Sequence, residues 1–195
     1  MKTCVFIIGT NASGKSTLAR ELIHRFGGVK KYDEGLTFCS DEKTAFAGKY
    51  ANVVYGGVDY FNSTKKLADI VKKGFETQDV IICEGSYMNT FGNNLTNTMF
   101  VAQKHLVVFL YASSKELDKR LKQRSGKGLS DRVLPKQKTA AAAMKKWASV
   151  GVPFVCIDTE NCGIEETAKI VFEKIQNLSS GDNNNSIAKG GSNDV

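Results

Sequence analysis

The sequence has no apolar run long enough to form a membrane-spanning helix, which needs roughly 20 consecutive apolar residues. It also has no signal-peptide pattern, because Met1 and Lys2 lead directly into a short β-rich segment. These two absences argue against a membrane protein and against a secreted one. We therefore expect a soluble protein of the cytoplasm, with no membrane partner.

The cysteine pattern indicates no metal or redox chemistry. None of the five cysteines forms a C-x-x-C pair, so neither a zinc site nor a disulfide framework is indicated. Cys4, Cys39, Cys83 and Cys156 fall within predicted strands, where we expect them to be small buried hydrophobic residues. With 195 residues, 42% of them hydrophobic, the chain is long enough for one well-buried core and short for two.

The sequence does contain a complete phosphate-binding loop. Residues 9–16 read Gly-Thr-Asn-Ala-Ser-Gly-Lys-Ser, which matches the pattern G-x-x-x-x-G-K-[ST], with a predicted strand before it and a predicted helix after it. A phosphate chain needs closely spaced backbone N–H donors and benefits from a helix N-terminus, and glycine permits the close approach. The predicted nucleotide contacts are Gly9, Thr10, Asn11, Ala12, Ser13, Gly14, Lys15, Ser16 and Thr17.

Two residues of this loop have predicted chemical roles. Lys15 would reach the β- and γ-phosphates of ATP, and the Ser16 hydroxyl would be a ligand of Mg²⁺, a hard cation that prefers oxygen. The sequence therefore predicts ATP and Mg²⁺ as cofactors.

Apolar strand patterns alternate with helical ones along most of the chain. Strands are predicted at 3–8, 36–39, 80–83, 105–111 and 154–157. Helices are predicted at 16–26, 58–75, 94–103, 113–124, 134–149 and 164–178. This alternation predicts an α/β fold of three layers, with a parallel sheet covered on both faces. We expect one domain over 1–178, followed by a disordered tail at 179–195.

Residues just past the carboxyl ends of parallel strands are the candidates for chemistry. Asp41 follows the second predicted strand and would be a general base toward an attacking hydroxyl, or only a helix cap. Glu84 ends the third predicted strand and would orient Mg²⁺, or be a structural turn residue.

The positive charge of the chain is concentrated in one window. Residues 113–149 hold eleven Lys and Arg residues against three acidic ones, a net charge of +8, whereas the whole chain carries +7. Arg120 and Arg124 lie four residues apart, on one face of a helix that begins with the capping box Ser113-Ser114-Lys115-Glu116. We expect 113–149 to be a lid over the nucleotide, with both arginines near the transferring phosphoryl group. The alternative is a solvated helix face.

The phosphate loop, Ser40-Asp41, Lys119-Arg120 and Arg124-Ser125-Gly126 together resemble the kinase domain of phage polynucleotide kinase, within the broader P-loop kinases. The resemblance extends from Lys2 to about Trp147. It implies a five-stranded parallel sheet of order 2-3-1-4-5, Asp41 as the catalytic base, and Arg120 and Arg124 as lid arginines. The sequence departs from that family at Glu84, where the family has Asp, and at residues 43–44, which lack an expected arginine.

The first functional hypothesis is a kinase that transfers the γ-phosphate of ATP to a hydroxyl on nucleic acid. The acceptor would be a 5′-hydroxyl end, or a hydroxymethyl group on a modified pyrimidine such as 5-hydroxymethyluracil in phage DNA, with the protein in the cytoplasm of the host. The basic window favours such a polyanion. The aromatic residues Tyr50, Tyr55, Tyr60 and Phe61 would stack on a base or belong to the core.

Two other hypotheses stay open. One is a small-molecule kinase acting on a nucleoside, nucleotide or sugar. It would differ from thymidylate kinases, because Glu84-Gly85-Ser86-Tyr87 stands where they have D-R-[YH]. The other is a non-kinase P-loop ATPase or switch, although the sequence has no guanine-reading N-K-x-D motif and no Asp-Glu pair that closes a strand. The sequence does not indicate an oligomeric state.

Overall fold

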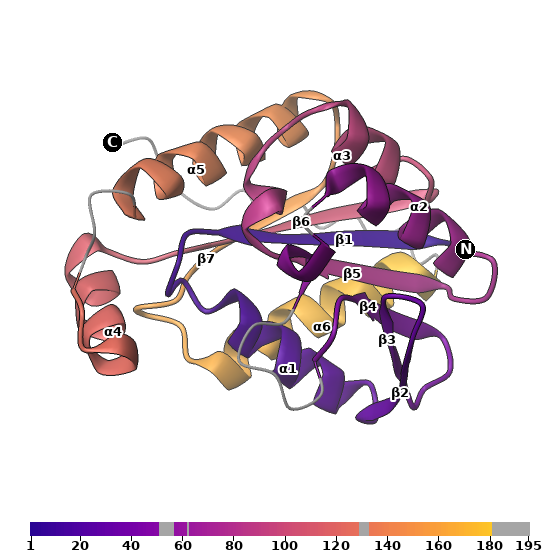
Figure 1. The fold of residues 1–195 in the computed structure, drawn as a ribbon, viewed down its shortest axis with the longest axis horizontal. Helices are drawn as coiled ribbons and strands as arrows, with labels where there is room; N and C mark the ends of the chain where they lie inside the picture. Colours follow the sequence, from indigo (N-terminus) through magenta and orange to yellow (C-terminus); the bar gives the residue numbers. More distant parts are fainter. Residues whose placement is uncertain (51–56, 62, 129–132, 181–195) are drawn as a thin grey trace.

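The computed structural model describes residues 1–50, 57–61, 63–128 and 133–180, and Figure 1 shows their arrangement. A central sheet of seven strands has the order β2-β3-β4-β5-β1-β6-β7. The strands are β1 (Thr3–Gly9), β2 (Val29–Asp33), β3 (Leu36–Cys39), β4 (Thr44–Ala47), β5 (Val80–Glu84), β6 (Lys104–Tyr111) and β7 (Phe154–Asp158). The helices are α1 (Lys15–Arg25), α2 (Thr64–Gly74), α3 (Asn93–Met99), α4 (Ser114–Ser125), α5 (Val133–Ser149) and α6 (Ile164–Ser180), with 3₁₀ helices η1 (Val58–Phe61) and η2 (Ser86–Asn89).

The α/β class is confirmed, but the predicted five-stranded parallel sheet of order 2-3-1-4-5 is wrong. The sheet is mixed, because β3 runs antiparallel to both β2 and β4, whereas β4, β5, β1, β6 and β7 pair in parallel. The sequence analysis missed β2, whose residues Val-Lys-Lys-Tyr-Asp are mostly exposed, and β4, whose four residues include two alanines. The predicted second strand is therefore β3, and the strand that pairs with β5 is β4.

Two hydrophobic layers lie on opposite faces of this sheet. In Figure 1, α1 and α6 lie on one face, and α2, α3 and α5 lie on the other. The first layer packs side chains such as Leu18 and Val171 against β1 and β6, and the second packs Val71 and Trp147 against the same sheet. The ring of Trp147 meets that of Phe6 edge to face, with centroids 5.6 Å apart.

The burial of α5 corrects the predicted extent of the lid. Ala140, Ala143 and Trp147 are buried in α5, so the part of the range 113–149 that forms this helix belongs to the core layer. Among the described residues, α4 and the first turn of α5 remain beside the phosphate loop: the Arg120 guanidinium donates to the Ala12 carbonyl oxygen, and the Val133 carbonyl oxygen accepts from the Thr10 hydroxyl. Residues 129–132, which include Arg132 and lie between these two helices in the sequence, are outside the described residues.

Other expectations have mixed outcomes. Cys4, Cys39 and Cys83 are buried as predicted, but Cys156 is exposed because β7 is an edge strand. Helix α6 continues to Ser180, so it includes the first two residues of the predicted tail, and 181–195 lie outside the described residues. Within the described part of the chain, no helix combines the length and the apolar character that a membrane crossing requires.

Candidate functional site

The phosphate-binding loop connects β1 to α1, as the sequence predicts. Gly9 ends β1 with φ +149°, and Gly14 precedes α1 with φ +95°, a region of backbone conformation that favours glycine. The Lys15 side chain is buried, and its Nζ donates hydrogen bonds of 2.9 Å to the carbonyl oxygens of Gly9 and Thr10. Burial lowers the pKa of Lys15, and the carboxylates of Glu84 and Asp59 oppose that shift.

A buried side chain from another segment holds the start of this loop. Asn89, the last residue of η2, accepts a hydrogen bond of 2.8 Å from the Gly9 N–H and donates one of 2.9 Å to the Gly9 carbonyl oxygen. The Thr10 hydroxyl donates to the carbonyl oxygen of Val133 over 2.9 Å. These bonds fix the loop to η2 and to the first residue of α5. Sequence analysis missed Asn89, and the residue type alone gives no signal that could have found it.

Ser16 and Glu84 lie together at the carboxyl ends of β1 and β5. The Ser16 hydroxyl donates to Glu84 Oε2 over 3.4 Å, whereas the buried Glu84 Oε1 has no hydrogen-bond partner among the described residues. Burial raises the pKa of Glu84, and Lys15 opposes that shift. The described residues contain no group of three or more His, Cys, Asp or Glu side chains that could hold a metal ion by themselves. A hydroxyl beside a buried carboxylate with an unpaired oxygen fits Mg²⁺, which takes few protein ligands and shares phosphate oxygens.

Asp59 is the carboxylate that sequence analysis missed. It lies in η1 and accepts hydrogen bonds of 2.8 and 3.0 Å from the Ser86 N–H and one of 3.3 Å from the Tyr87 N–H. A Cβ atom at Gly85 would lie 2.8 Å from Asp59 Oδ1, so only glycine permits this approach of η1 to the end of β5. The one available signal was an acidic residue two positions after Gly57, inside a segment predicted to be helical.

The structure does not bring Asp41 to this site. Asp41 follows β3, and because β3 is antiparallel, its end lies at the edge of the sheet where β4 and β5 begin. Its carboxylate accepts hydrogen bonds from the N–H groups of Lys43 and Thr44, at 3.2 and 3.0 Å, and from the Thr44 hydroxyl at 2.7 Å. Asp41 is thus a turn residue between β3 and β4, and its prediction as the catalytic base is wrong.

Arg120 is largely occupied by protein groups. Its guanidinium pairs with Glu116 at 2.9 Å, donates to the Ala12 carbonyl oxygen at 3.3 Å, and donates to the hydroxyl and carbonyl oxygens of Thr159 at 2.9 and 2.6 Å. Arg120 therefore ties α4 to the phosphate loop and to the segment after β7. The guanidinium of Arg124, one turn later, forms no hydrogen bond or ion pair with the described part of the chain, and its charge acts on Lys15.

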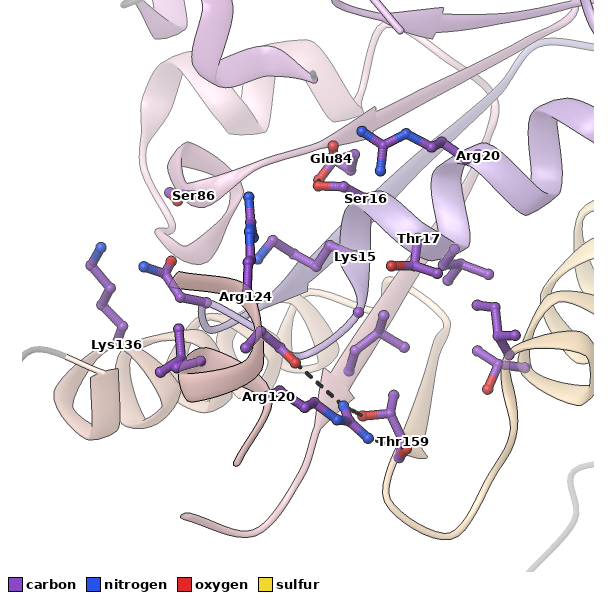
Figure 2. A pocket seen from close by; sticks show the side chains of 18 of the residues that line it. Lys15, Ser16, Thr17, Arg20, Glu84, Ser86, Arg120, Arg124, Lys136 and Thr159 are labelled. Carbon is purple, nitrogen blue, oxygen red and sulfur yellow. Dashed lines mark hydrogen bonds between the residues drawn. The ribbon is translucent and has the colours of Figure 1, made fainter. Parts of the chain in front are cut away.

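These groups surround one cavity of about 940 Å³, drawn in Figure 2. Its lining brings together Lys15, Ser16, Glu84, Asp59, Arg120 and Arg124, and it also includes Arg20, Ser86, Lys136 and the segment Cys162 to Gly163. Arg120 and Thr159 lie at one end in Figure 2, Lys15 and Arg124 near the middle, and Ser86 with Lys136 on the side away from Thr159. Of the predicted stacking residues, Tyr50 and Phe61 are buried, Tyr60 is exposed, and Tyr55 lies outside the described residues.

The fold agrees with that of known kinases. No protein-family model matches the sequence, and no curated protein matches it. Among solved structures, the YorR protein of Bacillus subtilis in complex with phosphorylated GDP is 16% identical, with a TM-score of 0.55 over 89% of this chain and 96% of that chain. A sugar kinase from Janibacter is 11% identical, with a TM-score of 0.52 over 92% and 95%. A gluconokinase from Sinorhizobium meliloti is 11% identical, with a TM-score of 0.51 over 92% and 94%.

The protein therefore has the α/β fold of P-loop small-molecule kinases, with a mixed sheet that is mostly parallel. The finer resemblance to phage polynucleotide kinase is not shown by these comparisons, and neither is a role in DNA modification.

Proposed function

We propose that the protein is a kinase that transfers the γ-phosphate of ATP to a hydroxyl group of a small molecule, a nucleoside, nucleotide or sugar. The observation that carries this proposal is the meeting of a phosphate-binding lysine, a carboxylate–hydroxyl pair suited to Mg²⁺ and a second carboxylate in one cavity. Asp59 adds to the nucleotide site a carboxylate that can accept a proton, which phosphoryl transfer to a hydroxyl uses.

The donor half of the cavity suits ATP. The backbone N–H groups of the loop and the N-terminus of α1 face the triphosphate position, and Lys15 is near enough to exchange its carbonyl partners for phosphate oxygens. Ser16 and Glu84 would hold Mg²⁺, which neutralises charge on the β- and γ-phosphates when it is bound. Arg124 would add positive charge there, while Arg120 and Thr159 would border the position of the base.

The acceptor half is built around Asp59. The N–H groups of Ser86 and Tyr87 orient its carboxylate at the cavity wall, and its charge acts on Lys15, which binds the phosphates. In this position Asp59 would accept the proton of the acceptor hydroxyl as that oxygen attacks the γ-phosphorus. The products would be ADP and a phosphomonoester, and the proton would leave through Asp59.

A nucleic acid acceptor is the second candidate, favoured by a specific surface feature. Helices α4 and α5 and the segment between them expose seven lysine side chains, at Lys115, Lys119, Lys122, Lys127, Lys138, Lys145 and Lys146. Only Lys119 and Lys122 of these pair with a carboxylate in the described structure, at 3.5 and 2.6 Å. A polyanion would contact such a surface with a strong dependence on salt.

The test is transfer of label from γ-labelled ATP to a panel of nucleosides, nucleoside monophosphates, sugars, 5′-hydroxyl oligonucleotides and hydroxymethyluracil DNA. Label on a small molecule supports the proposal, and label only on oligonucleotides, lost steeply between low and moderate salt, supports the second candidate. Lys15→Ala is the matched control and should abolish transfer. Release of free phosphate with every acceptor would refute both and indicate an ATPase.

A further inference from the structure

Lys136 is a cation that the donor chemistry does not require. It lies in the first turn of α5, is half-buried, and lines the cavity together with Asp59 and Ser86. Its ammonium group forms no hydrogen bond or ion pair with the described part of the chain. A cation near a helix N-terminus is unfavourable, and the first turn of α5 has no acidic residue to compensate it. The first turn of α5 therefore supplies no counter-charge for Lys136.

The charges along the cavity show where such an anion would bind. Arg120 is neutralised by Glu116, and Lys15 interacts with Glu84 and Asp59. Lys136 and Arg124 both act on Lys15 as further positive charges. Lys15 and Arg124 are placed to contact a magnesium-bound triphosphate, whereas Lys136 lies on the side of the cavity where Ser86 lies.

The position of Lys136 points to the acceptor rather than to the nucleotide. In Figure 2 the side chain of Lys136 extends on the side of the cavity where Ser86 lies, and Lys15 and Arg124 stand between it and the Arg120–Thr159 end. The nucleotide runs from that end toward Lys15 in the proposed function. An anion at Lys136 would thus belong to the molecule that approaches Asp59.

We propose that the acceptor carries an anionic group, a phosphate or carboxylate, in addition to its reacting hydroxyl, and that Lys136 binds this group. The inference rests on the proposed kinase function and narrows its substrate class to anionic alcohols. A nucleoside monophosphate, a sugar acid and a phosphodiester beside a hydroxyl share this chemistry, and Lys136 would select all of them against their neutral counterparts.

The experiment compares paired acceptors that differ in one charge: a nucleoside 5′-monophosphate with its nucleoside, gluconate with glucose, and an oligonucleotide with its neutral methylphosphonate analogue. We expect the protein to phosphorylate the charged member of one pair in preference to its neutral partner. The pair that shows this preference identifies which kind of anionic acceptor the protein uses. Lys136→Ala should raise the KM for that acceptor about ten- to hundredfold, as expected for loss of a charged hydrogen bond, and change the KM for ATP less than about twofold.

Two further variants make the test specific. Lys136→Arg retains the charge and should retain the preference, and Lys138→Ala, on the exposed side of the same helix, should behave as the wild type. Equal use of charged and neutral acceptors by the wild type, or a KM for ATP that rises as much as that for the acceptor, would overturn the inference.

Failure of the kinase function would be recognised separately, as the absence of label on every acceptor. In that case the same charged probes are titrated into the protein saturated with a non-hydrolysable ATP analogue. Binding that Lys136→Ala weakens would support the anion site independently of transfer. Binding of no charged probe would refute it.

Discussion

Substitution of Asn89 by alanine tests whether the phosphate loop depends on the side chain that clamps Gly9. The change removes two buried hydrogen bonds, of 2.8 and 2.9 Å. The Gly9 N–H then lacks its Asn89 partner, which costs about 1–3 kcal/mol for a buried donor left unsatisfied. The Gly9 carbonyl oxygen still has Lys15 Nζ at 2.9 Å in the absence of nucleotide, so that oxygen adds little to the cost.

Nucleotide binding should change this balance. When Lys15 turns to the phosphates, the Gly9 carbonyl oxygen of Asn89→Ala loses its second partner as well. The bound state therefore loses about 1 kcal/mol more than the free state, which corresponds to an increase in the Kd for ATP of about fivefold. The free protein should melt about 2–12 °C lower, because each kcal/mol shifts the Tm of a domain of this size by about 2–4 °C.

The assay is thermal melting with and without ATP, together with calorimetric titration of ATP. Asn97→Ala, at an exposed position on α3, is the control and should leave both quantities unchanged. A variant Asn89→Ala with a lowered Tm but an unchanged Kd for ATP would refute the reasoning, because Lys15 would then not leave the Gly9 carbonyl on binding. An unchanged Tm would show that the clamp does not stabilise the loop.

Three other predictions concern the carboxylates and one glycine. Asp59→Asn should lower kcat about 10²- to 10⁴-fold with an unchanged Kd for ATP. Asp41→Asn should keep kcat near the wild-type value. Steady-state measurement of kcat for both variants tests the two expectations. Folding raises the pKa of Glu84, so the folded protein favours the protonated carboxyl, and the stability this contributes is present at low pH and lost as the pH rises through the raised pKa. Melting curves measured across pH should show that loss. Mg-ATP should restore the stability at pH values above the raised pKa. Gly57→Ala should lower the Tm, because a Cβ there would meet the Glu84 carbonyl and lie 2.6 Å from Glu84 Oε1, and because φ is +80° at this position. Gly92→Ala should leave the Tm unchanged, because no described atom lies within 4 Å of a Cβ at that position.

The donor half of the site could be predicted from the sequence because it is local. A strand, a loop of fixed spacing and a helix follow one another without interruption, so residues 3–25 place Lys15 and Ser16 by themselves. Glu84 was also found, because it ends an apolar strand that pairs with β1. Those signals depend only on short-range pattern and on the rule that parallel strands end at one edge.

Asp41 was misplaced because one strand was missed. Thr44–Ala47 has two alanines and no alternation of apolar and polar residues, so β4 was not predicted as a strand. The sequence analysis therefore placed β3 in the parallel part of the sheet, in the position beside β5 that β4 occupies. A strand that reverses direction carries its last residues to the opposite edge, and this single change of pairing moved the predicted base away from the phosphate loop. The residue type at Asp41 was suitable for catalysis, and only the strand direction excluded it.

The acceptor half could not be predicted, because it is assembled entirely by tertiary contacts. Asp59 is held by backbone groups that follow β5, 27 positions further along the chain, and Lys136 comes from a helix on the face of the sheet opposite to α1. The segment from Ser86 to Asn89 contacts Asp59 at its start and Gly9 at its end. Donor loop and acceptor carboxylate are thus joined through four residues of η2. A displacement of η2 on acceptor binding would move the first residue of the phosphate loop with it, so the affinities for acceptor and ATP are expected to be coupled, and by thermodynamic linkage equally in both directions.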